Sequence, residues 1–145
     1  MKRTQIREQI FKLLFRREFN NEDDMPLQVK HFFENPTIEE DEENIMDVSL
    51  KTSEEMYILD KYNNIVEKIE EIDAIISKTA KGWTLDRIGK VDLTILRLAI
   101  FEMKYDEDIP VNVAIDEAIE LAKKFGQDES SSFVNGILAN IAKQE

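Results

Sequence analysis

The sequence predicts an all-α protein, a compact single domain of about seven helices spanning residues 1–145. Apolar residues are so dense between Val91 and Met103 that they cover nearly every face of a helix. Several other segments carry apolar residues at spacings of three and four, the period of an α-helix. No segment has a convincing strand pattern, and the short apolar run 108–114 is better explained as a helix start. Because a helix that is apolar on all sides must be enclosed, we expect other helices to pack around residues 91–103.

Length and composition limit the class of protein. A chain of 145 residues with 42% hydrophobic residues is large enough to form a core. The absence of cysteine excludes disulfides, thiolate metal sites and a cysteine nucleophile. No signal peptide is evident, and no apolar run approaches the roughly 20 residues that cross a bilayer. We therefore expect a cytoplasmic protein that does not contact membranes.

The charge is distributed unevenly. The formal net charge of -12 argues against broad affinity for polyanions. Residues 1–18 nevertheless hold six basic and two acidic side chains, a net charge of +4. Acidic residues gather at 22–24 and 39–43. The chain is acidic with a basic amino-terminal segment.

Residues 1–19 form the first predicted helix, with an apolar stripe that should dock on the core: Ile6, Ile10, Leu13 and Leu14. Cations and aromatic rings follow the border of that stripe, at Arg3, Arg7, Phe11 and Phe15. This combination suits single-stranded nucleic acid, because cations meet phosphates and rings stack on bases. The alternative is that the two phenylalanines are core residues and the arginines form a solvated rim.

A second, shorter helix should follow the polar loop 20–24, with Pro26 at its first position and Asn35–Pro36 after its end. It contains His31, the only histidine, which we interpret as a surface residue because no other ligand type lies at coordinating spacing. The acidic segment 37–48 lacks the alternating oxygen ligands and turn glycine of a calcium loop, so we expect a solvated connector.

From Ser53 to Ile76 the helical period returns, as one long helix or two joined tightly, with Asp73 as a candidate cap for the second. The sequence Gly82-Trp83-Thr84 then interrupts the pattern. We expect Trp83 to be a core anchor beneath the turn rather than a ligand platform, and Thr84 to cap the next helical segment.

After residues 91–103, a polar turn is expected at 105–108, and Pro110 and Gly126 mark the start and end of the next helix. A turn at 127–132 leads into the last helix, which contains Gly136. A glycine within a helix costs about 1 kcal/mol relative to alanine. It therefore usually indicates that another backbone approaches closely or that space is left open at that position.

Arg97 lies in the middle of the most apolar helix. A buried guanidinium without a partner costs several kcal/mol by rough estimate. We expect a carboxylate on the following helix to pair with it, and the candidates are Asp116, Glu117 and Glu120.

The patterns typical of enzymes are missing from the sequence. It contains no glycine-rich phosphate loop, no nucleophile elbow, and no histidines and carboxylates at metal-binding spacing. We therefore expect a binding protein without catalysis, cofactor or metal.

Three ordered blocks resemble the NusB family of transcription antitermination factors. They are WTLDRIGKVDLTILRLAIFEM at 83–103, DIPVNVAIDEAIELAKKFG at 108–126 and SxxFVNGIL at 130–138. The basic amino-terminal segment, where Arg3 and Arg7 precede an apolar stripe, adds to the resemblance, whereas residues 20–80 contribute little.

The resemblance implies two packed helical subdomains and a non-catalytic adaptor. Such proteins bind the boxA element of ribosomal RNA leader transcripts together with the ribosomal protein NusE, and load onto elongating RNA polymerase. The implied RNA contacts fall at both ends of this chain, at Lys2, Arg3, Thr4, Arg7, Lys123, Ser130 and Phe133.

The resemblance also implies that NusE is a basic protein. Acidic residues of this chain, including Asp86 and Asp92, are therefore expected to attract it. The alternative is a protein-interaction scaffold of the same fold with weak or lost RNA binding, which the net charge and the short basic head favour. The sequence leaves open whether the chain forms a homodimer.

Overall fold

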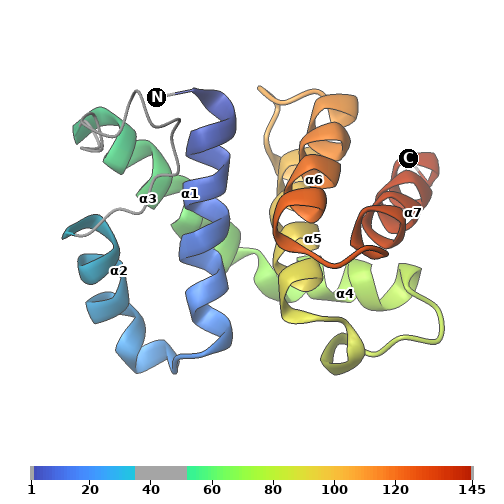
Figure 1. Ribbon diagram of the computed structural model, residues 1–145, viewed down its shortest axis with the longest axis horizontal. Helices are drawn as coiled ribbons and strands as arrows, with labels where there is room; N and C mark the ends of the chain where they lie inside the picture. Colours follow the sequence, from blue (N-terminus) through green and yellow to red (C-terminus); the bar gives the residue numbers. More distant parts are fainter. Residues whose placement is uncertain (1, 35–51, 145) are drawn as a thin grey trace. The chain divides into compact units, whose positions relative to one another are not determined.

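The computed structural model describes residues 2–34 and 52–144 (Figure 1). Within these ranges it contains seven α-helices and no strand, which confirms the predicted all-α class and helix number. The chain divides into two compact units, Met1–Asn63 and Asn64–Glu145. A single domain over 1–145 stays a prediction. None of the described helices is both long enough and apolar enough to cross a membrane.

Unit 1 is formed by the first three helices. Helix α1 spans Arg3–Phe15 and α2 spans Met25–Glu34, and they run in opposite directions (Figure 1). Two short 3-10 turns connect them, η1 at Arg16–Glu18 and η2 at Glu22–Asp24. Helix α3, Thr52–Glu67, continues a few residues beyond the unit.

The core of unit 1 contains most of the stripe predicted for the first helix. Buried apolar side chains come from α1, α2 and α3: Ile10, Phe11, Leu13, Leu14, Met25, Phe32, Ile58 and Tyr62. Phe11 is therefore a core residue, which agrees with the alternative that the phenylalanines of this helix belong to the core. Phe15 is half-buried and stacks on it, with ring centroids 5.8 Å apart. Arg16 ties η1 to α2, because its Nη1 donates to the Gln28 carbonyl at 3.0 Å.

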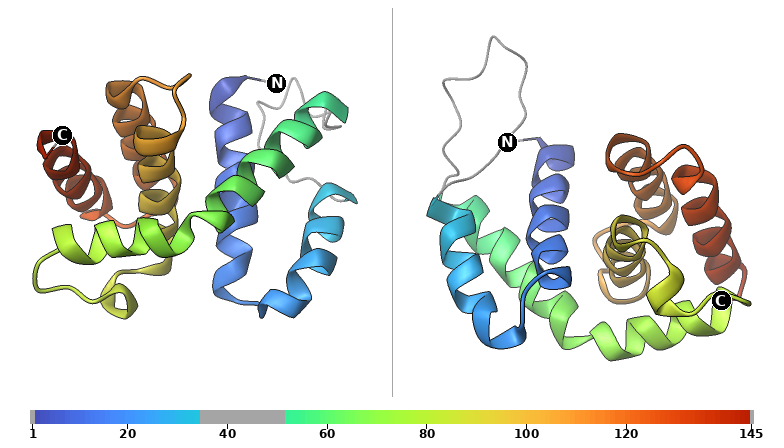
Figure 2. Two further views of the ribbon diagram at one scale, coloured as in Figure 1. Left: turned by 180° about the vertical axis from the view of Figure 1, so that it is seen from behind. Right: turned by 60° about the horizontal axis from the view of Figure 1, so that its bottom comes forward.

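Unit 2 holds the other four helices. They are α4 (Ile69–Thr79), α5 (Lys90–Tyr105), α6 (Val111–Phe125) and α7 (Ser130–Lys143), with the 3-10 turn η4 (Leu85–Arg87) before α5. Helix α5 packs against α4, α6 and α7. Helix α4 crosses the others at a steep angle, as both views in Figure 2 show.

Helix α5 contains residues 91–103, the stretch that we expected other helices to enclose. Ten of its 16 residues are buried, on several faces, which confirms that other helices enclose it. The polar side chain of Thr94 is satisfied internally, because its hydroxyl donates to the Lys90 carbonyl at 2.7 Å. The buried surface of α5 therefore fixes the relation of α4, α6 and α7 within unit 2.

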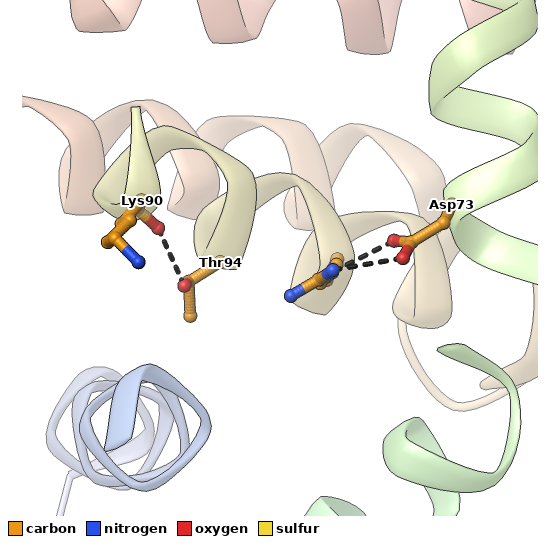
Figure 3. Close-up of polar contacts among 4 residues, drawn as sticks. Asp73, Lys90 and Thr94 are labelled. Atoms are coloured by element: carbon orange, nitrogen blue, oxygen red, sulfur yellow. Dashed lines mark hydrogen bonds and ion pairs between the residues drawn. The ribbon is translucent and has the colours of Figure 1, made fainter. Parts of the chain in front are cut away.

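Arg97 pairs with a helix other than the one we expected. Its bidentate partner is Asp73 of α4, with Nε–Oδ1 and Nη2–Oδ2 both at 2.9 Å (Figure 3). The prediction named acids of α6 and assigned Asp73 to a helix cap. Asp73 instead lies inside α4, which is separated from α3 by Lys68 alone, so the chain has two tightly joined helices here.

Several turn predictions are confirmed and two are wrong. Pro110 precedes α6 and Gly126 directly follows it. Trp83 was expected in the core but is 50% exposed. Thr84 occupies the N-cap position of η4, but its side chain makes no capping hydrogen bond. The expected connector 37–48 and the helix end at 35–36 lie outside the described residues.

Candidate functional site

The start of α1 exposes a small polar and cationic group in unit 1. Lys2, Arg3 and Thr4 are all exposed. The backbone fixes this turn, because the Lys2 amide donates to Gln5 Oε1 at 2.9 Å and the Lys2 carbonyl accepts from the Ile6 amide at 3.0 Å. Cations at a helix amino terminus oppose the helix dipole. Lys2 and Arg3 thus do not stabilise the helix end and are available to an anionic ligand.

Arg7 differs from the other RNA contacts predicted for the amino-terminal segment. It lies one turn further along α1 and is buried, with 7% of its surface exposed, and it interacts with neighbouring groups. The prediction treated Arg7 as an edge residue like Arg3. Its charge still contributes to the positive potential of this end of α1, since a charge acts over several ångströms.

Unit 2 contains a cavity of about 660 Å³. Its walls come from the α4–α5 connection, the start of α5, and the turn between α6 and α7. Three aromatic and four charged side chains line it: Trp83, Phe125, Phe133, Arg87, Lys90, Asp92 and Glu129. Rings and hydrogen-bonding groups thus converge on one concave surface, which is the usual character of a ligand site.

Trp83 reaches this cavity because of the turn before it. The Trp83 amide donates to the Ala80 carbonyl at 3.0 Å, and Gly82 has a φ of 85°. A positive φ at this place in a tight turn favours glycine, because glycine has no Cβ. The Trp83 ring then meets Phe133 edge to face, with centroids 5.9 Å apart and an interplanar angle of 68°.

Phe133 is positioned by the turn between α6 and α7. The Gln127 amide donates to Ser130 Oγ at 2.9 Å, and the Ser130 amide donates back to the Gln127 carbonyl at 3.0 Å. A Cβ built on Gly126 would lie 2.5 Å from Ser130 Cβ, so this turn has no room for a larger residue. The start of α7 is therefore held in one position, and Phe133 with it.

The structure brings together part of the predicted site. Ser130, Phe133 and Asp92 line the same cavity, and Asp86 is exposed in η4 beside Arg87. Ser130 is buried, so its side chain acts mainly within the turn. Lys123 lies outside the cavity, exposed, with its Nζ 3.7 Å from Glu120. Lys2, Arg3, Thr4 and Arg7 belong to unit 1.

Sequence reasoning missed Trp83, Arg87 and Lys90 as lining residues of this cavity. A signal was present, because Gly82 forces a turn and a tryptophan directly after a tight turn is readily exposed. We expected Trp83 beneath this turn as a core anchor, and half of its surface is exposed instead. His31, predicted to be a surface residue, is exposed in α2.

Comparisons with known proteins agree on one family. A sequence profile described as the NusB family matches residues 4–143. The transcription antitermination protein NusB of Lachnoclostridium phytofermentans is 45% identical over 141 residues, covering 97% of this chain and 98% of the relative. A crystal form of T. maritima NusB is 34% identical with a TM-score of 0.81, covering 100% of this chain and 93% of that one.

A third match is a crystal structure of antitermination factors NusB and NusE in complex with double-stranded RNA. It is 26% identical to this chain with a TM-score of 0.74, covering 99% of this chain and 97% of that one. These similarities extend over both units.

Proposed function

The chain belongs to the NusB family, and we propose that it is a transcription antitermination adaptor that binds boxA-type single-stranded RNA together with the ribosomal protein NusE. The observation that carries this proposal is the extent of the match, since the family profile covers residues 4–143 and thus both units. A NusB relative of known structure was crystallised with both NusE and RNA, which supports both kinds of partner.

RNA contact in unit 1 is assigned to the exposed start of α1. Lys2 and Arg3 would bind phosphates, and Thr4 would donate or accept a hydrogen bond beside them. Arg7 is buried and adds its charge without reaching the surface. Because few cations take part, the affinity of this unit for RNA alone is modest, and the salt dependence corresponds to about two to four ions.

RNA contact in unit 2 is assigned to the start of α7 and the end of α6. Phe133 would stack on a base, while Ser130 keeps the turn in place through Gln127. Lys123 would reach a phosphate by releasing Glu120, a solvent-exposed pair that contributes little to stability.

NusE contact is assigned to two carboxylates, Asp86 of the α4–α5 connection and Asp92 of the first turn of α5. A basic partner is drawn to carboxylates in an acidic protein, and the attraction raises its rate of association. Partner binding compensates for the small number of phosphate contacts, since both proteins then hold the same RNA.

The adaptor acts in the cytoplasm, on elongating RNA polymerase, without catalysis. A homodimer would be a storage state if it covers the RNA-facing surface. Transcription through a terminator placed behind a ribosomal RNA leader tests the function: purified polymerase with NusE and this chain should read through more often than without the chain. Equal termination with and without the chain, in the presence of all other factors, contradicts the proposal.

A second candidate is a protein-interaction scaffold with lost RNA binding. The burial of Arg7 favours it, because only Lys2 and Arg3 remain exposed among the predicted cations of α1. RNA binding by one double variant, Lys2→Glu with Arg3→Glu, distinguishes the two candidate functions. The adaptor loses RNA binding and keeps NusE binding, whereas the scaffold shows no RNA binding before or after the change.

A further inference from the structure

We propose that the cavity of unit 2 binds one unstacked base of a single-stranded RNA on the exposed face of Trp83, beside Phe133, with Arg87 on a flanking phosphate. The inference rests on the proposed function and deepens it, because it gives Trp83, Arg87 and Lys90 roles in RNA recognition. Four observations carry it, and each concerns residues of unit 2 alone.

The first observation is the balance of charge in the cavity. Two basic side chains, Arg87 and Lys90, face two acidic ones, Asp92 and Glu129. A phosphate inside would meet as much repulsion as attraction, so a neutral, flat group with hydrogen-bonding edges fits better. An unstacked base is such a group. The volume of about 660 Å³ lies within the range of sites for small ligands, roughly 300–1,000 Å³.

The second observation is the arrangement of the rings. Trp83 and Phe133 meet at 68°, so one ring turns its edge to the other and keeps faces that this partner does not cover. Half of Trp83 is exposed. Its indole N–H has no hydrogen-bond partner among residues 2–34 and 52–144. Trp83 thus offers a stacking face and an unused donor, the two things a base requires.

The third observation is that two defined turns position the backbone that carries each ring. Gly82 sets the turn that presents Trp83, and the reciprocal bonds of Gln127 and Ser130 set the start of α7. Less conformational freedom is then lost on binding, which favours affinity. Exposed aromatic rings on mobile loops would not give this advantage.

The fourth observation concerns the path of the strand outside the cavity. Helix α7 is the one described α-helix without an acidic residue, in a chain with 31 of them. Gly136 lies one turn beyond Phe133, and a Cβ built on it would meet nothing within 4 Å. Arg87 is exposed and forms no ion pair with another described residue. A sugar–phosphate backbone can therefore pass along α7 without meeting a carboxylate of that helix and reach Arg87.

The experiment uses Trp83 as its own reporter, since it is the only tryptophan in the chain. The full chain is titrated with boxA RNA and with a series of the same RNA carrying one abasic site each. We expect the intact RNA to quench Trp83 fluorescence. One abasic position should abolish the quenching and weaken binding by roughly 5- to 100-fold, the usual effect of losing a stacked base.

Substitutions then identify the contact, with binding followed by anisotropy of labelled RNA. Trp83→Leu should lose a similar factor and become insensitive to that abasic position, whereas Trp83→Phe should keep most of the affinity. Tyr57→Leu, an exposed ring of unit 1 outside the cavity, is the matched control and should bind normally. Arg87→Gln should weaken binding, whereas Lys81→Gln, an exposed cation outside the cavity lining, should not.

Three results overturn the inference. Normal RNA binding by Trp83→Leu, with no quenching of the wild type, overturns it and leaves the proposed function standing. Quenching by NusE alone and not by RNA overturns it in favour of a protein side chain in the cavity. Failure of the wild type to bind RNA, with or without NusE, overturns both proposals together.

Discussion

Asp73 and Arg97 hold α4 against α5 through two parallel hydrogen bonds, Nε–Oδ1 and Nη2–Oδ2, each 2.9 Å long. Their side chains are 20% and 15% exposed, so the pair is shielded from water on most sides. Bidentate geometry is the strongest arrangement of a guanidinium and a carboxylate. Arg97 therefore has a structural role within unit 2.

Arg97→Ala should lower the free energy of unfolding by about 3 kcal/mol, because it leaves the Asp73 carboxylate shielded and unpaired. Asp73→Ala should cost a similar amount. The double variant should cost clearly less than the two losses added, since the partners share one interaction. Urea denaturation of the three variants measures these values. Additive losses would show that the two residues act independently.

Gly126→Ala and Gly136→Ala should change stability in opposite directions. At Gly126 a methyl group meets Ser130 at 2.5 Å, so the turn must shift, and we expect a loss of about 1–3 kcal/mol. At Gly136 the added methyl group has open space, and the higher helix propensity of alanine should raise stability by up to about 1 kcal/mol. Thermal denaturation of both variants and the wild type measures these two changes in stability. A stability loss at Gly136 would contradict the open space described here.

Tyr105 should make the stability of unit 2 depend on alkaline pH. Its hydroxyl donates to Glu71 Oε2 at 2.7 Å, and this hydrogen bond, with a smaller effect of burial, raises the pKa of Tyr105 above its ordinary value of 10.0. Since the pKa is higher in the folded than in the unfolded chain, the stabilisation is complete below about pH 10 and is lost as the pH rises through the folded value.

Tyr105→Phe should therefore lose less stability than the wild type between pH 9 and pH 11, which chemical denaturation at several pH values measures. Burial raises the pKa of Tyr62 as well, so that residue still titrates in the variant and serves as the internal comparison. Identical pH profiles for wild type and variant would rule out the Glu71 bond as a source of stability.

Lys2→Gln with Arg3→Gln should weaken RNA binding and flatten its salt dependence. If each cation neutralises one phosphate, the slope of log K against log salt should fall by about 1–1.5 for a single strand. Lys30→Gln, an exposed cation of α2 in the same unit, is the matched control and should leave the slope unchanged. A weaker affinity with an unaltered slope would mean that the two residues do not contact phosphates.

The sequence was sufficient for the fold because its apolar residues follow the helical period almost everywhere. The boundaries of α5, α6 and α7 lie within a few residues of their predicted positions, since Pro110 and Gly126 have strong positional preferences. The partner of Arg97 was missed because pairing across 24 residues depends on how α4 crosses α5, which periodicity does not determine.

The candidate site was harder to predict than the fold. Exposed cations such as Lys2 and Arg3 were identified from local charge, but the burial of Arg7 depends on packing in three dimensions. Trp83 was expected beneath the Gly82 turn as a core anchor, whereas in the structure that turn presents it at the surface. The cavity itself joins the α4–α5 connection to the α6–α7 turn, segments about 40 residues apart whose proximity follows from helix packing.

The most direct test of the central claim is a titration of labelled boxA RNA with this chain at low salt, with and without NusE, beside a double-stranded and a scrambled single-stranded RNA. We predict modest affinity for boxA RNA alone, a clear increase when NusE is present, and weaker binding of the scrambled strand. No binding of boxA RNA in either condition, or equal binding of the scrambled strand in both, would contradict the assignment of this chain as an RNA-binding adaptor.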